Sequence, residues 1–118
     1  MGQKSILVVD DDEVILLALQ AIIEKENYRV FTATNGQEAL EVLTEMPRPC
    51  VILLDLMMPV MDGWEFLDVK KKNPAYSSIP TIVISAFSDQ AKKVNADGFL
   101  KKPIDMKTLL QALGNFCS

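Results

Sequence analysis

The sequence predicts an α/β protein with a doubly wound, five-stranded parallel sheet and helices on both faces. Short apolar runs rich in β-branched residues alternate with segments of helical periodicity along all 118 residues. This alternation is typical of parallel strands joined by right-handed crossovers. Three of the runs are continuously apolar, as strands that are covered on both faces are. The length is that of one domain, and no linker or internal repeat divides the chain.

Five short runs are the predicted strands, and they are spread along the whole chain. They are Ile6 to Val9, Arg29 to Ala33, Val51 to Leu54, Thr81 to Ile84 and the brief Phe99 to Leu100. Such short β-branched runs, separated by helical segments, predict buried strands.

Two of the intervening segments have a clear core-facing stripe. Apolar residues recur at the spacing of one helical face after the first strand and again near the C-terminus. They are Val14, Leu17, Ala18, Ala21 and Ile22 in the first segment, and Met106, Leu109, Leu110 and Leu113 in the last.

The helix ends are also legible. Thr34 and Gln37 have the spacing of a capping box, so the second helix is expected to begin at Thr34. Asp12 and Asp105 are the candidate N-caps of the first and last helices. The third helix is expected to end in the stretch Lys70 to Pro74, where cations lie near the last carbonyls and a proline follows.

The composition excludes several kinds of chemistry. The chain has no histidine, so it forms no Ser-His-Asp triad and no His-ligated metal site, and it carries no phosphohistidine. Its net charge of -4 gives no general attraction to nucleic acid, and its apolar stretches are far shorter than the ~20 residues that cross a bilayer. With only Cys50 and Cys117 and no secretory signal, we expect a reducing, cytoplasmic setting and no redox role for the two cysteines.

Polar side chains follow four of the five predicted strands. Asp10 and Asp11 follow the first strand, Asp55 the third, Ser85 the fourth and Lys102 the fifth. Ligands of open parallel sheets bind beyond the carboxyl ends of the strands, so these residues are the candidate site. If the strand order is 2-1-3-4-5, the acids of the first and third strands face each other at the centre of the sheet.

Several carboxylates at one sheet edge repel one another, and this predicts a bound cation. Oxygen ligands and an open edge favour a hard ion such as Mg2+ over a soft metal. Asp55, walled on one side by Leu56 to Pro59, would then act as a nucleophile toward phosphorus. Lys102 and Ser85 would contact phosphoryl oxygens, which is the charge neutralisation that phosphoryl transfer requires.

Four segments in register carry a resemblance to a known family. They read ILVVDDDE, VILLDLMMPVMDG, IPTIVISA and GFLKKPID, with 45 residues from Asp10 to Asp55, 30 from Asp55 to Ser85 and 17 from Ser85 to Lys102. From Lys4 to about Phe116, the chain resembles the receiver domain of two-component response regulators, of the single-domain, chemotaxis-regulator-like kind. The resemblance implies a flavodoxin-like sheet of order 2-1-3-4-5 and a single receiver domain over residues 1–118, without an output domain.

The resemblance also implies a phosphoacceptor and a metal site. Asp55 would accept a phosphoryl group from a phosphohistidine of a sensor histidine kinase or a histidine phosphotransfer protein. Asp10, Asp11, Asp55 and the backbone carbonyl of Met57 would hold Mg2+. Lys102, joined to Pro103 by a cis peptide bond, would contact the phosphoryl group.

A conformational switch is implied as well. Ser85 would move toward the phosphoryl group and Phe99 would turn inward behind it. The protein would catalyse only its own phosphorylation and dephosphorylation, so it is not expected to be a metabolic enzyme. The resemblance implies a cytoplasmic monomer that binds a downstream protein when phosphorylated, without direct contact to nucleic acid or membrane.

Two features leave other functions open. Only the eleven residues Phe87 to Asp97 separate Ser85 and Ala86 from Gly98. This predicts a shortened fourth helix on the usual output face and leaves room for a phosphorylation-independent scaffold. Asp10 and Asp12 also have the spacing of the two acids in haloacid-dehalogenase-type phosphatases, where they would be nucleophile and general acid. Against that alternative, Glu13 replaces the usual Thr or Val, and Asp55 would have no role.

Overall fold

The computed structural model describes residues 3–86 and 96–118. Its elements in chain order are β1 (Ser5–Val9), α1 (Glu13–Glu24), β2 (Arg29–Ala33), α2 (Gly36–Glu45), β3 (Val51–Asp55), α3 (Gly63–Lys72), β4 (Thr81–Ser85), β5 (Gly98–Lys101) and α5 (Met106–Cys117). Each predicted strand is present to within one residue at either end. The short fourth helix was predicted within Phe87 to Asp97, and residues 87–95 of that range lie outside the described residues, so it stays a prediction.

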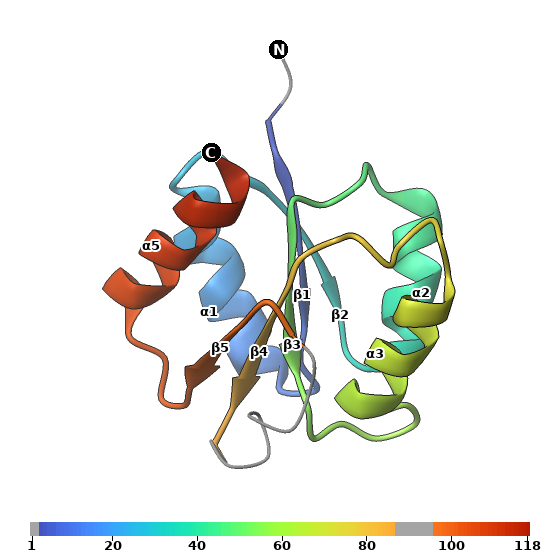
Figure 1. Ribbon diagram of the computed structural model, residues 1–118. Helices are drawn as coiled ribbons and strands as arrows, with labels where there is room; N and C mark the ends of the chain where they lie inside the picture. The colour runs from blue at the N-terminus through green and yellow to red at the C-terminus, as the bar shows by residue number, and fades with distance from the viewer. Residues whose placement is uncertain (1–2, 87–95) are drawn as a thin grey trace.

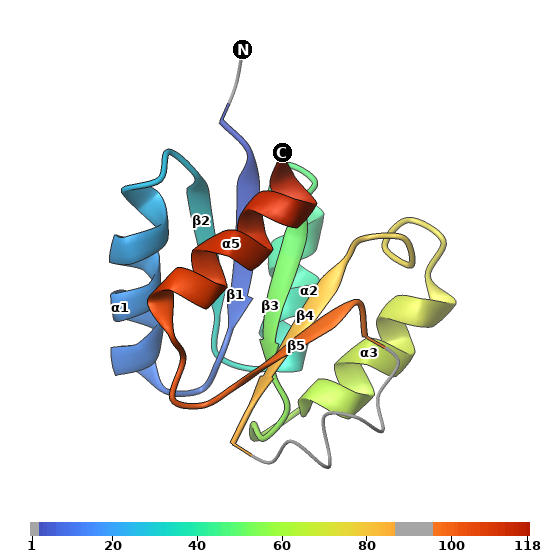
Figure 2. The ribbon, with the colours of Figure 1, turned by 60° about the vertical axis from the view of Figure 1, so that its left-hand side comes forward.

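The five strands form one parallel sheet in the order β2-β1-β3-β4-β5. This confirms the predicted topology, and Figure 1 shows β1 and β3 in the middle of the sheet. Figures 1 and 2 together show α1 and α5 on one face, with α2 and α3 on the other. Strand β2 is thus added on one side of β1 and strands β3 to β5 on the other, and the carboxyl ends of β1 and β3 are neighbours.

The apolar runs bury both faces of the sheet. Side chains of a strand alternate between faces, so Ile6 and Val8 of β1 pack with α1 and α5, whereas Leu7 and Val9 pack with α2 and α3. All five residues of β1, β3 and β4 are buried. The interior positions of these strands are apolar because neither face meets solvent, and their polar residues lie at the strand ends.

The helix caps agree with the sequence at three of four predicted ends. The carboxylates of Asp12 and Asp105 accept N–H groups of the first turns of α1 and α5, and α3 ends at Lys72 with Asn73 as its C-cap. The predicted start of α2 was wrong by one residue. Asn35 is the N-cap and its side chain accepts the Glu38 N–H at 2.8 Å; Thr34 instead donates its own N–H to the Glu38 carboxylate.

A disulfide joins Cys50, just before β3, to Cys117, the last residue of α5. Their Cα atoms are 5.3 Å apart, within the range that a disulfide needs. This pairing was not predicted from the sequence. The pairing was hidden because 67 positions separate the two residues, and only the packing of α5 over the sheet brings them together. Within the described ranges, no helix is long and apolar enough to span a membrane.

Candidate functional site

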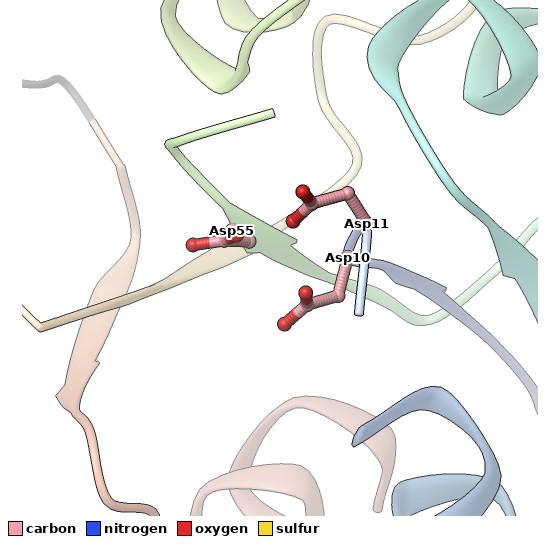
Figure 3. Close-up of side chains that lie close together, drawn as sticks. All are labelled: Asp10, Asp11 and Asp55. Atoms are coloured by element: carbon pink, nitrogen blue, oxygen red, sulfur yellow. The ribbon is translucent and has the colours of Figure 1, made fainter. Parts of the chain in front are cut away.

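Three aspartates from two neighbouring strands meet at the carboxyl edge of the sheet. Asp10 and Asp11 follow β1, and Asp55 is the last residue of β3. The register pairs Val9 with Leu54, so the next residues of both strands leave the sheet side by side. The three carboxylate groups lie within 4.8 Å of one another, and Figure 3 shows their side chains gathered at this edge.

The two inner carboxylates are buried, and burial changes the ionisation of Asp55. Asp10 and Asp55 are only 3% and 6% exposed, whereas Asp11 is exposed. Burial, followed by the charge of Asp10, raises the pKa of Asp55 from 3.8 to about 6. Lys102 and the backbone N–H of Met57 oppose this shift without cancelling it. The site therefore holds more negative charge than it can easily stabilise.

Among the described residues, Lys102 supplies a cation to this acidic cluster. Its Nζ lies 3.2 Å from Oδ2 of Asp10 and 3.5 Å from Oδ1 of Asp55. Burial alone would lower the pKa of Lys102, but Asp10 and Asp55 outweigh it, so the pKa is raised. The backbone N–H of Lys102 donates to the Ser85 carbonyl at 2.9 Å, which fixes the lysine beside the end of β4. The Lys102–Pro103 peptide bond is cis, as expected.

This arrangement is matched by known proteins. A family model described as "Response regulator receiver domain" matches residues 6–114. The chain belongs to this family. Receiver domains are phosphoacceptor switches of two-component signalling rather than classical enzymes, and histidine kinases or phosphotransfer proteins phosphorylate them.

Individual relatives span nearly the whole chain. Sporulation initiation phosphotransferase F of Bacillus subtilis is 32% identical over 121 residues, covering 98% of this chain and 95% of the relative. The chemotaxis response regulator CheY4 of Vibrio cholerae has a similar structure, with a TM-score of 0.86, 32% identity and coverage of 98% and 99%. The receiver domain of the sensor histidine kinase PA1611 of Pseudomonas aeruginosa has a TM-score of 0.87 at 26% identity, with 98% of both chains covered.

The receiver family binds Mg2+ at its acidic cluster, and the donors of this chain fit that ion. Three carboxylates converge, and hard oxygen donors suit Mg2+ better than a soft metal. The raised pKa of Asp55 is a second sign of fit, because a nearby cation would favour the ionised form. Asp10, Asp11 and Asp55 are the side chains that would hold it.

Asp12, the third aspartate of the run, caps a helix and is not one of the three clustered acids. The Asp12 carboxylate accepts the backbone N–H groups of Val14 and Ile15 at 2.9 and 3.3 Å, and it thereby caps α1. The Asp12 backbone N–H donates to Oδ1 of Asp10 at 2.9 Å. Asp12 thus stabilises a helix terminus and orients Asp10, which makes it a poor general acid for the phosphatase alternative.

The remaining predicted residues occupy different surroundings. Ser85 is buried at the end of β4, next to the strand position of Lys101. Phe99 lies on the edge strand β5 and is 46% exposed. Met57 is exposed in the loop after β3, and its backbone N–H is hydrogen-bonded to Asp55. Their functional roles remain predictions.

Gly63 supports the site, although no role was predicted for it. A Cβ at this position would lie 2.6 Å from the Asp55 carbonyl oxygen and 2.7 Å from the Leu56 Cα. The Gly63 N–H donates to the Leu56 carbonyl at 2.9 Å, so the start of α3 packs directly on the backbone that carries Asp55. The glycine of the MDG segment was the signal, but only the folded loop shows this close approach.

Proposed function

We propose that this protein is a phosphorylation-dependent switch of a two-component phosphorelay in which Asp55 is the phosphoacceptor. The observation that carries the proposal is the position of Asp55 between two acids and a lysine at the open edge of the sheet. The phosphoryl donor is a phosphohistidine on a partner kinase or phosphotransfer protein. The phosphorylated form then binds a downstream protein.

The residues around Asp55 suit this reaction. An oxygen of the Asp55 carboxylate attacks phosphorus, a new O–P bond forms, and the P–N bond to the donor imidazole breaks; the imidazole leaves with the electron pair and takes up a proton. Lys102, already 3.5 Å from Asp55, stabilises the charge that develops on the phosphoryl oxygens. Mg2+ held by Asp10, Asp11, Asp55 and the Met57 carbonyl would neutralise further charge on the phosphoryl group.

Relatives support both the transfer and the ion. One of the relatives is named a phosphotransferase, and the PA1611 receiver structure has a magnesium ion coordinated in its active-site cleft. The same acidic edge is present here. We therefore expect phosphorylation of this chain to depend on Mg2+.

Ser85 and Phe99 are the proposed switch pair. Ser85 is at the end of the strand next to β3, so its hydroxyl would donate to a phosphoryl oxygen on Asp55. Phe99 is half exposed, so inward rotation of its ring would bury apolar surface and favour the phosphorylated conformation. A ligand or modification that favours one conformation in this way shifts an existing equilibrium.

An apolar surface beside the site fits a donor protein. Val14 and Leu17 of α1 are exposed, and a hollow of about 490 Å³ is formed between α1 and the segment that leads into α5. Its lining includes Lys102 of the site together with Ile15, Ala18 and Pro103. We propose that the helix bearing the phosphohistidine docks here, since this surface adjoins the nucleophile. The switch would act in the cytoplasm as a monomer, as one receiver domain over residues 1–118, without contacting nucleic acid or membrane.

Intact-mass spectrometry tests the phosphoacceptor. The protein is incubated with acetyl phosphate, with Mg2+ or with a chelator, as the native chain and as Asp55→Asn. We expect one phosphoryl adduct on the native chain that requires Mg2+ and is lost in Asp55→Asn. Asp68→Asn, which changes an exposed aspartate of α3, is the matched control and should be phosphorylated normally.

Other outcomes separate the alternatives. An unmodified native chain that still binds Mg2+, followed by Trp64 fluorescence, would favour the phosphorylation-independent scaffold. An adduct that persists in Asp55→Asn and disappears in Asp10→Asn would favour the phosphatase.

Leu17→Glu tests the proposed docking surface on α1. Phosphoryl transfer from phosphorylated histidine phosphotransfer domains is expected to fall at least tenfold in this variant, while phosphorylation by acetyl phosphate stays within twofold. Equal transfer to the native chain and to Leu17→Glu would place donor docking elsewhere.

A further inference from the structure

The disulfide lies at the end of the sheet opposite to the phosphoacceptor. Cys50 directly precedes β3, and Asp55 ends it, so the two residues are five positions apart along an extended strand, or roughly 16 Å. Figure 1 shows the C-terminal end of α5 and the acidic edge at opposite ends of the sheet. The cysteine pair is therefore a feature that phosphoryl transfer does not use.

Both oxidation states are compatible with the surroundings of the pair. Sγ of Cys50 lies 3.4 Å from the Ser5 carbonyl oxygen, so a reduced Cys50 thiol would have a hydrogen-bond acceptor within reach once the two sulfurs had moved apart. Cys117 is buried in the apolar cluster that contains Leu109 and Leu113, where a free thiol behaves as a small hydrophobic side chain.

The two sulfurs differ in access. Cys50 is half-buried, in a loop just before the strand, whereas Cys117 is 4% exposed. A small thiol arriving from solvent would therefore attack at Cys50, and Cys117 would be the leaving sulfur. Thiol–disulfide exchange depends on such access to one sulfur.

The end of α5 depends on this connection. The last turn of α5 contains no basic residue, so no side-chain cation there offsets the negative end of the helix dipole. The exposed Lys4 Nζ donates to the carbonyl of Ser118 at 3.1 Å, but an exposed contact of this kind contributes little. With the disulfide open, the last turn would keep its helical hydrogen bonds and the packing of its buried side chains, but it would lose its covalent link to the start of β3.

We propose that Cys50 and Cys117 form a reversible redox site for low-molecular-weight thiols and disulfides of the glutathione class. Its disulfide fixes the last turn of α5 to the sheet, independently of Asp55. In reduction, a small thiolate bonds to Sγ of Cys50, the Cys50–Cys117 bond breaks, and Cys117 leaves as a thiolate that takes up a proton. A second small thiolate attacks the sulfur of the first, releasing Cys50 as a thiol and the two small thiols as their disulfide.

A titration in glutathione tests the reversibility. The full chain is equilibrated without oxygen over a range of reduced-to-oxidised glutathione ratios, quenched in acid, alkylated with N-ethylmaleimide and weighed intact. We expect no adduct at the oxidised end, two at the reduced end, and the same midpoint from both directions. A pair that stays reduced throughout, stays oxidised throughout, or accumulates a stable glutathione adduct would overturn the proposal.

Hydrogen exchange tests the effect on α5. In the reduced native chain, amides of residues 114–117 should exchange at least tenfold faster than in the oxidised chain, while those of β3 stay within twofold. Cys50→Ser/Cys117→Ser should behave like the reduced chain in both buffers; if either serine disturbs folding, the reduced native chain carries the comparison alone. Equal exchange rates of the α5 amides in the oxidised and reduced chains would overturn the proposal that the disulfide fixes the last turn of α5 to the sheet. Acetyl phosphate labelling of Asp55 is measured in the same samples, so failure here is distinct from failure of the proposed switch.

Discussion

The two ends of β3 differ in their chemistry: acidic side chains gather at the carboxyl end, and a disulfide crosslink lies at the amino end. At the carboxyl end, Asp55 lies within 4.8 Å of two further acids, and burial with its neighbours raises its pKa to about 6. At the amino end, Cys50 is linked to the last residue of α5 by a disulfide. One end thus concentrates groups that repel one another, and the other is crosslinked.

This difference separates residues that stabilise the fold from residues that make it reactive. Repulsion at the acidic edge opposes folding at neutral pH, but it also prepares the edge for a cation and a phosphoryl group. A crosslink at the far end stabilises the same strand without touching the reactive groups. Removal of the crosslink should therefore lower the stability of the fold, whereas removal of the Asp55 charge should raise it.

The largest effect is expected from Cys117→Ala in the oxidised protein. A crosslink between residues 67 positions apart is worth at most about 4 kcal/mol through the entropy of the unfolded chain. The free energy of unfolding, measured in urea without reductant, should fall by roughly that amount, while Mg2+-dependent phosphorylation below the transition is retained. In excess reductant the two proteins should differ by less than about 1 kcal/mol; a difference that persists there would mean that packing, rather than the crosslink, is responsible.

A smaller loss is expected from Lys102→Met at the acidic end. Lys102 is the described cation that contacts both Asp10 and Asp55, so its removal leaves two largely buried carboxylates without a countercharge. We expect a loss of about 2 kcal/mol in urea unfolding at neutral pH, less than for a fully buried pair because the edge is open. Saturating Mg2+ should recover much of the loss; an equal loss with and without Mg2+ would contradict the electrostatic explanation.

Most of the fold was predictable because its signals are local. Continuous apolar runs gave the strands to within one residue, and Asp12 and Asp105 cap the helices that were expected to follow them. The predicted start of α2 was wrong by one residue because Thr34 and Asn35 are adjacent and both residue types can cap a helix. Which of the two is the N-cap depends on the backbone conformation of the folded chain, and there it is Asn35. The disulfide depends on contact between distant segments, which no local pattern records.

The candidate site also contains residues that the sequence predicts and a contact that only the folded chain shows. Asp10, Asp11, Asp55 and Lys102 were found because parallel strands bring their carboxyl ends to one edge. The close approach of Gly63 to the Asp55 backbone could not be predicted, since it depends on the path of the loop between β3 and α3. Val60 in that loop has a φ of 68°, a conformation that β-branched residues rarely adopt, and nothing in its sequence signals it.

Asp55→Asn should raise stability, in contrast to the two changes above. The pKa of Asp55 is raised from 3.8 to about 6 by burial and by Asp10, so the folded protein binds this proton more tightly than the unfolded chain. The stabilisation that protonation provides is complete below about pH 4 and is lost as the pH rises through about 6. Asn does not ionise, so without Mg2+ the variant should be about 1 to 2 kcal/mol more stable at pH 7, after allowance for screening at the open edge.

The pH series gives the decisive reading for Asp55→Asn. The native chain and Asp55→Asn are unfolded in urea between pH 4 and 7 with a chelator present. The difference between their free energies of unfolding should shrink toward pH 4. Added Mg2+ at pH 7 should narrow it by stabilising the native chain alone. A difference in free energy of unfolding that does not change with pH would show that the Asp55 carboxylate is not destabilising. The contrast between the two ends of β3 would then rest on the disulfide alone.

The smallest effect is expected from Lys72→Met, the matched control for Lys102→Met. Lys72 lies 3.2 Å from Asp68, the same distance as Lys102 from Asp10, but the Lys72 side chain is 76% exposed and that of Lys102 only 23%. Solvent screens the outer pair, so its loss should change the free energy of unfolding by less than about 0.5 kcal/mol, with no response to Mg2+. Equal losses in the two variants would mean that lysine packing, not burial of charge, governs the acidic end.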